Sequence, residues 1–166
     1  EGKYYKMKGV SIYPKPIQKP HPPIMIASWG SEQGLRRVAK YADGWMASAS
    51  QIRPDKFRAK WRQLLTYRKE LNKDVESFEN SVMTMFGYID NDKEKVHRMA
   101  KEILSPVLGR SADELENLLL FGSPEQCLKK INDLYESGAK RIHFWPVNDY
   151  IEQIEIFFKE IAQKFS

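Results

Sequence analysis

The stretch that decides the fold reads IMIASWGSEQGLRRVAKYADGWMA and covers residues 24–47. It begins with a continuous apolar run at 24–27, which is typical of a strand buried on both faces. A short break at 28–31 follows, and a second apolar run lies at 45–47. Between them, apolar residues recur at the spacing of one helical face, at Leu35, Val38, Ala39 and Ala42. The stretch therefore predicts a strand, a helix and a second strand.

The same alternation continues toward the carboxyl end. Further strands are predicted at 81–89 and 141–145 from their apolar and β-branched residues. Apolar residues at helical spacing, with caps and breakers at the ends, predict helices at 54–71, 92–105, 111–119, 123–138 and 149–165. Ser111 with Glu114, and Ser123 with Gln126, have the spacing of capping boxes. Strands that alternate with helices pair in parallel, so the predicted class is α/β with about four strand–helix units.

The length limits how this pattern can close. The chain has 166 residues and a mass of 19.4 kDa, whereas a complete eight-fold β/α barrel usually needs about 250 residues. Residues 1–23 contain five prolines, which permit neither a helix nor a central strand. We expect this part to be a proline-rich arm or a loop that crosses the barrel, packed on it through its tyrosines. The folded domain is expected at 24–166.

Composition disfavours several classes of protein. Lys and Arg number 27 against 22 Asp and Glu, but the net charge of +5 is spread along the chain and not gathered as in most nucleic-acid binders. No run approaches the roughly 18 apolar residues of a membrane span. The single Cys127 excludes an internal disulfide and is expected to be a buried, unreactive thiol. No secretory signal is visible after Glu1, so a cytoplasmic protein is expected.

One loop is the best candidate for a binding site. In parallel α/β folds the loops after the carboxyl ends of the strands build the site, and here they are predicted at 28–31, 48–53, 90–92 and 146–148. The first brings Ser28, Gly30 and Ser31 to the start of a helix, where free amides and the helix dipole favour an anion such as phosphate. The alternative is that Ser31 is only a helix cap and Gly30 only a turn residue.

Longer motifs point to a family. The run PKPIQKPHPPIMIASWGS at 14–31 leads into ADGW at 42–45, and FGSPEQ at 121–126 precedes SGA at 137–139. In this order they resemble the bacterial luciferase-like, flavin-dependent monooxygenase family over essentially the whole chain. The sequence departs from the family at the turn, where Ser28 and Trp29 stand in place of the usual pair of glycines.

The resemblance implies an eight-fold β/α barrel that binds reduced FMN or, in some branches, a reduced deazaflavin. The flavin branch oxidises a small organic substrate with O2, and the deazaflavin branch transfers hydride. The turn that matches Ser28, Trp29, Gly30 and Ser31 contacts the cofactor phosphate in that family. Only the carboxyl-terminal half of the barrel is matched, so we expect the carboxyl-terminal portion of a flavin-dependent oxidoreductase and assign no catalytic residue.

Two other classes stay open: a non-catalytic half-barrel that binds a phosphate-bearing ligand or pairs with another subunit, and a basic interaction module. Because half a barrel exposes strand edges and an apolar inner face, we expect either a missing amino-terminal half or self-association. A histidine on a barrel strand, as predicted for His143, is more often packed or hydrogen-bonded than catalytic. His21 and His97 are weaker candidates, and three dispersed histidines with one cysteine predict no metal site.

Overall fold

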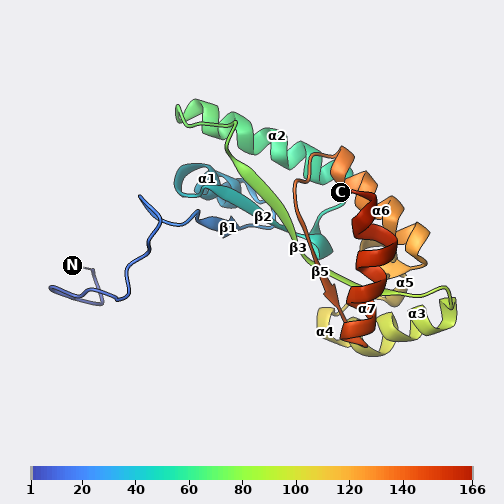
Figure 1. Cartoon of the computed structure of the whole chain (residues 1–166). Helices are drawn as coiled ribbons and strands as arrows, with labels where there is room; N and C mark the ends of the chain where they lie inside the picture. The colour runs from blue at the N-terminus through green and yellow to red at the C-terminus, as the bar shows by residue number, and fades with distance from the viewer. Residues whose placement is uncertain (1, 166) are drawn as a thin grey trace.

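The computed structural model describes residues 2–165, and its framework is a parallel five-stranded sheet (Figure 1). The strands are β1 (Met25–Ala27), β2 (Gly44–Ser48), β3 (Glu79–Ile89), β4 (Leu120–Gly122) and β5 (Ile142–Pro146). β1 pairs with β2, and β2 with β3. β4 and β5 both pair with β3, at Gly87–Ile89 and at Val82–Gly87 respectively. Every pairing is parallel, which confirms the predicted α/β class.

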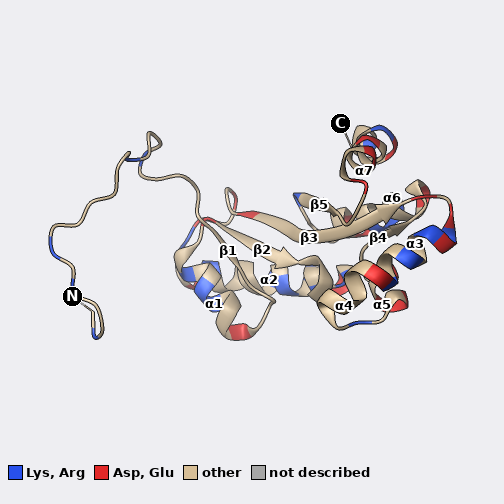
Figure 2. Cartoon of the chain, turned by 90° about the horizontal axis from the view of Figure 1, so that it is seen from below, with Lys and Arg blue, Asp and Glu red and all other residues tan. Residues whose placement is uncertain are grey.

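Helices connect the strands. They are α1 (Glu32–Tyr41), α2 (Pro54–Glu70), α3 (Lys93–Met99), α4 (Ser105–Leu108), α5 (Ala112–Leu118), α6 (Pro124–Glu136) and α7 (Tyr150–Ile156). Two π-helical segments, Ala100–Leu104 and Phe157–Ile161, continue α3 and α7, and short 3-10 turns occupy Ala49–Gln51 and Ala162–Lys164. Acidic and basic residues are interspersed along the helices, as Figure 2 shows.

Three details differ from the sequence prediction. β4 was not predicted, because its three residues continue the apolar spacing of α5. The helix expected to end before Pro106 continues to Leu108, since the π-helical turn shifts the bonding so that the Ser105 amide reaches Ala100 O. Ser111 caps α5, but Glu114 does not close the box and lies 3.6 Å from Arg110 Nη1 instead. The capping box of Ser123 and Gln126 is confirmed.

The ADGW motif joins β1 to β2. Asp43 accepts a hydrogen bond of 2.7 Å from the Ile24 amide and donates its own amide to Ile24 O at 2.8 Å. A β-carbon on Gly44 would lie 2.3 Å from Sδ of the Met25 side chain and 2.8 Å from Glu79 O of β3, so the position has no room for a larger residue. The two hydrogen bonds between Asp43 and Ile24 therefore hold the register of the first strand pair.

Stacked aromatic rings anchor α2 to the sheet. Trp45 of β2 stacks on Phe57 at 5.2 Å and on Trp61 at 6.5 Å between centroids, and Trp61 stacks on Phe78 at 5.5 Å. Trp45, Phe57 and Phe78 are fully or almost fully buried. Because each ring buries a large apolar area, this stack packs α2 firmly against the sheet.

One buried and one partly buried cation bind carbonyls at the ends of helices. The Arg68 guanidinium donates to Ala39 O at 3.3 Å and Ala42 O at 3.0 Å at the carboxyl end of α1, and it lies 3.9 Å from the Phe78 ring. Lys130 donates to Glu116 O and, at 2.8 Å, to both Leu119 O and Phe121 O. Burial lowers the pKa of both cations. These carbonyls have no further helical donor, so the cations satisfy them.

The side chains of β5 alternate between the two faces of the sheet. Phe144 stacks on Phe157 at 4.6 Å, toward the terminal helix, whereas Trp145 is 43% exposed and meets Phe86 edge-on at 5.6 Å. His143 is exposed and has no partner among residues 2–165, so the expectation of a packed or hydrogen-bonded histidine is wrong. The face that carries Phe86, His143 and Trp145 is thus open.

Residues 2–23 form an arm without helix or strand that leads away from the sheet (Figure 1). Its large apolar side chains are between 66% and 97% exposed, namely Tyr4, Tyr5, Met7, Val10, Ile12, Tyr13 and Ile17. The expected packing of the tyrosines on the domain is therefore absent within the described chain. Among residues 2–165, no helix combines the length and apolar character needed to cross a membrane.

We predict that Arg68→Met destabilises the chain by about 2–4 kcal/mol, because it leaves Ala39 O and Ala42 O buried without a donor. Urea unfolding followed by circular dichroism measures the change. Lys69→Met is the matched control, since Lys69 is the next residue of α2 and is exposed. Equal unfolding midpoints for the two variants would show that Arg68 does not cap α1.

Candidate functional site

The turn at residues 28–31 lies where β1 ends and α1 begins, as predicted. The Ser28 amide donates to Met46 O at 3.1 Å, and Trp45 Nε1 donates to Ser28 O at 3.0 Å. Both backbone groups of Ser28 are therefore bonded to β2, so the neighbouring strand fixes the start of the turn.

Two hydroxyls and one glycine shape the rest of this turn. Ser28 Oγ accepts from the Gly30 amide and Ser31 Oγ from the Gly34 amide, each at 3.2 Å. Gly30 has a φ of +87°, a conformation that L side chains rarely adopt. Because both hydroxyls act as acceptors within the turn, their protons are free to bond an incoming acceptor.

The amino end of α1 adds donors to the same place. The first amides of a helix have no intrahelical acceptor, and α1 has ten residues whose dipoles add at this end. Glu32 adds a carboxylate, but Arg36 Nε binds it at 3.1 Å, and this hydrogen bond raises the pKa of Arg36. Trp29 is 77% exposed and stands beside these donors.

Lys60 is a member of this site that the sequence analysis missed. A β-carbon built on Gly30 would lie 3.4 Å from Lys60 Cγ and 3.6 Å from Cδ, so the lysine side chain runs along Gly30. Its ammonium donates to Gln63 at 3.2 Å. Lys60 belongs to α2 and reaches the turn at Ser28–Ser31 only because α1 packs on α2. No local sequence motif predicts this position. The turn thus combines helix amides, two hydroxyls and a cation, a set suited to an anion.

A second polar group lies in the neighbouring loop. Ser48 Oγ is 3.2 Å from Ser50 Oγ and 3.3 Å from Thr84 Oγ1, and these three hydroxyls are partly buried. Thr84 has a φ of +54° at the irregular register of β3 between Val82 and Met85. A β-branched residue at positive φ is strained, and such positions gather at functional sites. The sequence predicted the 48–53 loop but not Thr84.

The remaining two predicted loops are held by structural bonds. Asp90 binds Lys95 at 3.0 Å, and the Asp92 amide, which hydrogen-bonds to Asp90, lowers the pKa of that carboxyl. Directly after the last loop, Asp149 accepts a 2.5 Å hydrogen bond from Tyr88. The Gln153 amide bonds both the amide and the carbonyl of Ile89, at 2.6 and 3.1 Å. These residues join α3 and α7 to β3.

The sequence of this chain matches a known protein family. A family model described as luciferase-like monooxygenase matches residues 1–141. An uncharacterized protein of Mycobacterium tuberculosis is 31% identical over 52 residues, which are 31% of this chain and 18% of that protein.

Solved structures share the fold. A coenzyme F420-dependent tetrahydromethanopterin reductase from Methanopyrus kandleri has a TM-score of 0.75 at 19% identity, over 100% of this chain and 57% of its own. An F420-dependent secondary alcohol dehydrogenase gives 0.80 at 17%, over 98% and 54%. The oxygenating constituent of 3,6-diketocamphane monooxygenase from Pseudomonas putida, in complex with FMN, gives 0.67 at 17%, over 99% and 57%. The chain is a partial β/α barrel that spans about half the length of these structures.

The buried Cys127 of α6 provides a test of how well this helix is packed against the interior. Burial raises the pKa of its thiol to about 11, so at pH 8 only about one thiol in a thousand is the reactive thiolate. A free cysteine with a pKa of about 8.5 is roughly a quarter ionised at that pH. We therefore expect a disulfide reagent to modify the folded chain roughly 200-fold more slowly than the urea-unfolded chain. Equal rates at pH 8 would mean that Cys127 is accessible in the folded state.

Proposed function

Because this chain belongs to the luciferase-like monooxygenase family, we propose that it is the carboxyl-terminal half of the barrel of a flavin- or deazaflavin-dependent oxidoreductase. In this proposal the turn of Ser28, Trp29, Gly30 and Ser31 binds the phosphate of the cofactor. The observation that carries it is the convergence of helix amides, serine hydroxyls and Lys60 at that turn.

The residues of the turn fit a phosphate group. A phosphate accepts hydrogen bonds from amides and hydroxyls at a helix amino end, and a nearby ammonium offsets its charge. Gly30 leaves the turn without a side chain where the backbone must approach the ligand. The exposed Trp29 offers a flat apolar surface beside the phosphate. Ser28 and Trp29, which replace the family's usual glycines, therefore remain compatible with this role.

The cofactor we propose first is reduced FMN, with a reduced deazaflavin as the second candidate. A reduced flavin supplies electrons for the oxidation of an organic substrate with O2, whereas a reduced deazaflavin supplies hydride. The similar structures include both kinds, since two are named for F420 and one contains FMN. What the described residues do is hold the phosphate at Ser28–Ser31 and present Phe86, His143 and Trp145 on the open face of the sheet.

That open face motivates the second part of the proposal. Only one edge of β1 and one edge of β5 are paired, and the apolar side chains of the arm are exposed. Unpaired parallel edges and apolar patches of this kind are normally covered. We propose that the amino-terminal half of the barrel, or a second copy of the chain, covers them in a cytoplasmic protein. The alternative function is a non-catalytic half-barrel that binds a phosphate-bearing ligand or pairs with another subunit.

We predict that Ser31→Asp weakens FMN binding about three- to tenfold, because a carboxylate at the first turn of α1 repels the phosphate. Aspartate is itself a good helix cap, so α1 should remain folded. Flavin fluorescence is titrated with the chain supplemented by an amino-terminal barrel fragment of the family. Ser111→Asp makes the same change at the cap of α5, away from the turn, and should leave the affinity unaltered. Equal affinities for both variants would remove the phosphate from this turn.

We also predict that the chain alone self-associates at micromolar concentration and binds FMN only after the complementary fragment is added. Light scattering gives the mass, and flavin fluorescence gives the binding. A stable monomer would contradict the idea that the open face needs a cover. Stoichiometric flavin binding with turnover by the chain alone would contradict the proposal that the site needs the other half of the barrel.

A further inference from the structure

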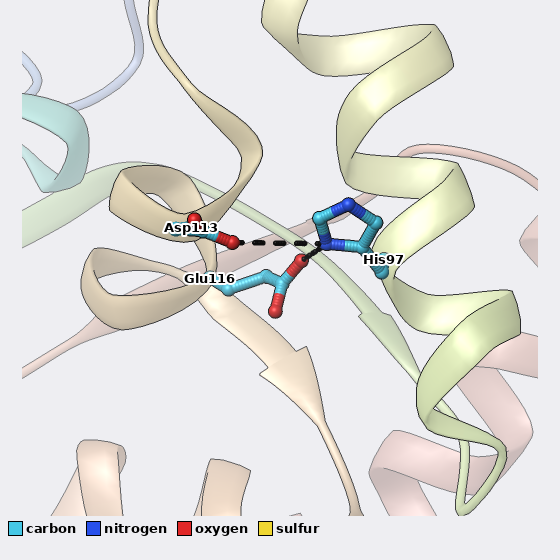
Figure 3. A group of neighbouring side chains, drawn as sticks. All are labelled: His97, Asp113 and Glu116. Atoms are coloured by element: carbon cyan, nitrogen blue, oxygen red, sulfur yellow. Dashed lines mark hydrogen bonds and ion pairs between the residues drawn. The ribbon is translucent and has the colours of Figure 1, made fainter.

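A helical hairpin between β3 and β4 brings together three side chains that the flavin proposal does not use. Its first arm consists of α3, the π-helical turn and α4, and its second arm is α5. The chain reverses at Gly109, which has a φ of +64°. Figure 3 shows His97 of the first arm facing Asp113 and Glu116 of the second.

The three side chains converge on one point. His97 Nδ1 lies 2.8 Å from Glu116 Oε1 and 3.9 Å from Asp113 Oδ1 (Figure 3). One ligand atom from each residue lies within 4.8 Å of the others. Asp113 and Glu116 are three residues apart on α5, so both carboxylates project from the same face of that helix.

We propose that His97, Asp113 and Glu116 form a binding site for a divalent transition-metal cation, with Zn²⁺ as the expected ion. One imidazole nitrogen and two carboxylate oxygens are ordinary zinc ligands, and three protein ligands leave a fourth position for water. Ligand atoms at about 2.0–2.2 Å from a tetrahedral zinc ion lie roughly 3.3–3.5 Å apart. The observed 2.8 and 3.9 Å fall on either side of this value, and the ligand atoms of Asp113 and Glu116 lie within 4.8 Å of each other, so rotations of the exposed side chains can bring all three to the ion.

Charge and access fit the same ion. With a neutral imidazole the donor set carries two negative charges, which a divalent cation neutralises. The side chains of His97, Glu116 and Asp113 are 45%, 29% and 86% exposed, so the ion can enter from solvent. A nitrogen donor and only three protein ligands do not suit Ca²⁺ or Mg²⁺, which prefer six or more oxygens or retained water shells.

A simple hydrogen-bonded pair of His97 and Glu116 is the competing explanation. It accounts for the 2.8 Å contact but not for Asp113, whose carboxylate pairs only with His97 among residues 2–165. Lys130 further holds this arm through its bond to the backbone carbonyl of Glu116, so the end of α5 that carries this carboxylate is fixed before any ion arrives. The hairpin therefore presents a preorganised pair and a third carboxylate within reach.

The test is a zinc titration of the EDTA-treated chain by isothermal calorimetry. We expect one ion per chain with micromolar affinity. His97→Gln retains a hydrogen-bond donor for Glu116 but is a poor zinc ligand, and Asp113→Asn leaves the His97–Glu116 contact intact. Each should weaken zinc binding roughly tenfold or more. Zinc should also raise the melting temperature of the unsubstituted chain and not that of His97→Gln.

His21→Gln is the matched control. His21 lies 3.9 Å from Asp43, a histidine–carboxylate contact that lacks a third ligand, so its loss should leave zinc affinity unaltered. Absence of zinc binding to the folded chain, confirmed as folded by circular dichroism, would overturn the proposal. So would zinc binding that His97→Gln and Asp113→Asn leave unchanged. Neither result depends on flavin binding, so failure here leaves the proposed oxidoreductase function untouched.

Discussion

Parallel pairing along β3 is the constraint on which the rest of the structure depends. β2, β4 and β5 all bond to this one strand of 11 residues, at successive and overlapping positions. Each parallel neighbour requires a crossover on the way back, so the strand dictates where the helices lie. Arg68, Lys130 and Gln153 then satisfy the polar groups at the ends of these connections. The loops that could bind a ligand emerge where this framework ends.

The parts of the fold that could be predicted are those that depend on the spacing of residues near one another in the sequence. The strand–helix alternation, the turn at Ser28–Ser31 and the capping box at Ser123 follow from spacing and cap chemistry, and the structure has them. β4 was not predicted, because its three residues directly follow a helix and are too few to show the alternation typical of a strand. The continuation of the helix past Pro106 was not predicted, because the π-helical turn that precedes this proline has no sequence pattern of its own.

In the candidate site, too, some features follow from local sequence and others arise only from tertiary packing. Its turn could be located from sequence, because a strand end and a helix cap are local features. Lys60, Thr84 and the grouping of His97 with Asp113 and Glu116 could not, since tertiary packing or an irregular strand register creates each of them. A count of histidines and cysteines misses a cluster whose other two members are common surface acids. Such sites become visible only when helices are placed in space.

The turn at Ser28–Ser31 is notable for where its contacts come from. Ser28 bonds to β2, Gly30 lies against Lys60 and Ser31 caps α1, so all of these contacts lie within residues 24–60. None involves the later strands or the terminal helix. Because the segment contains all of these contacts, it can be exchanged between related barrels as one unit and keep its conformation. Recombination at residues 24 and 60 would therefore carry this turn, together with Lys60, into a related barrel without changing the contacts that shape it.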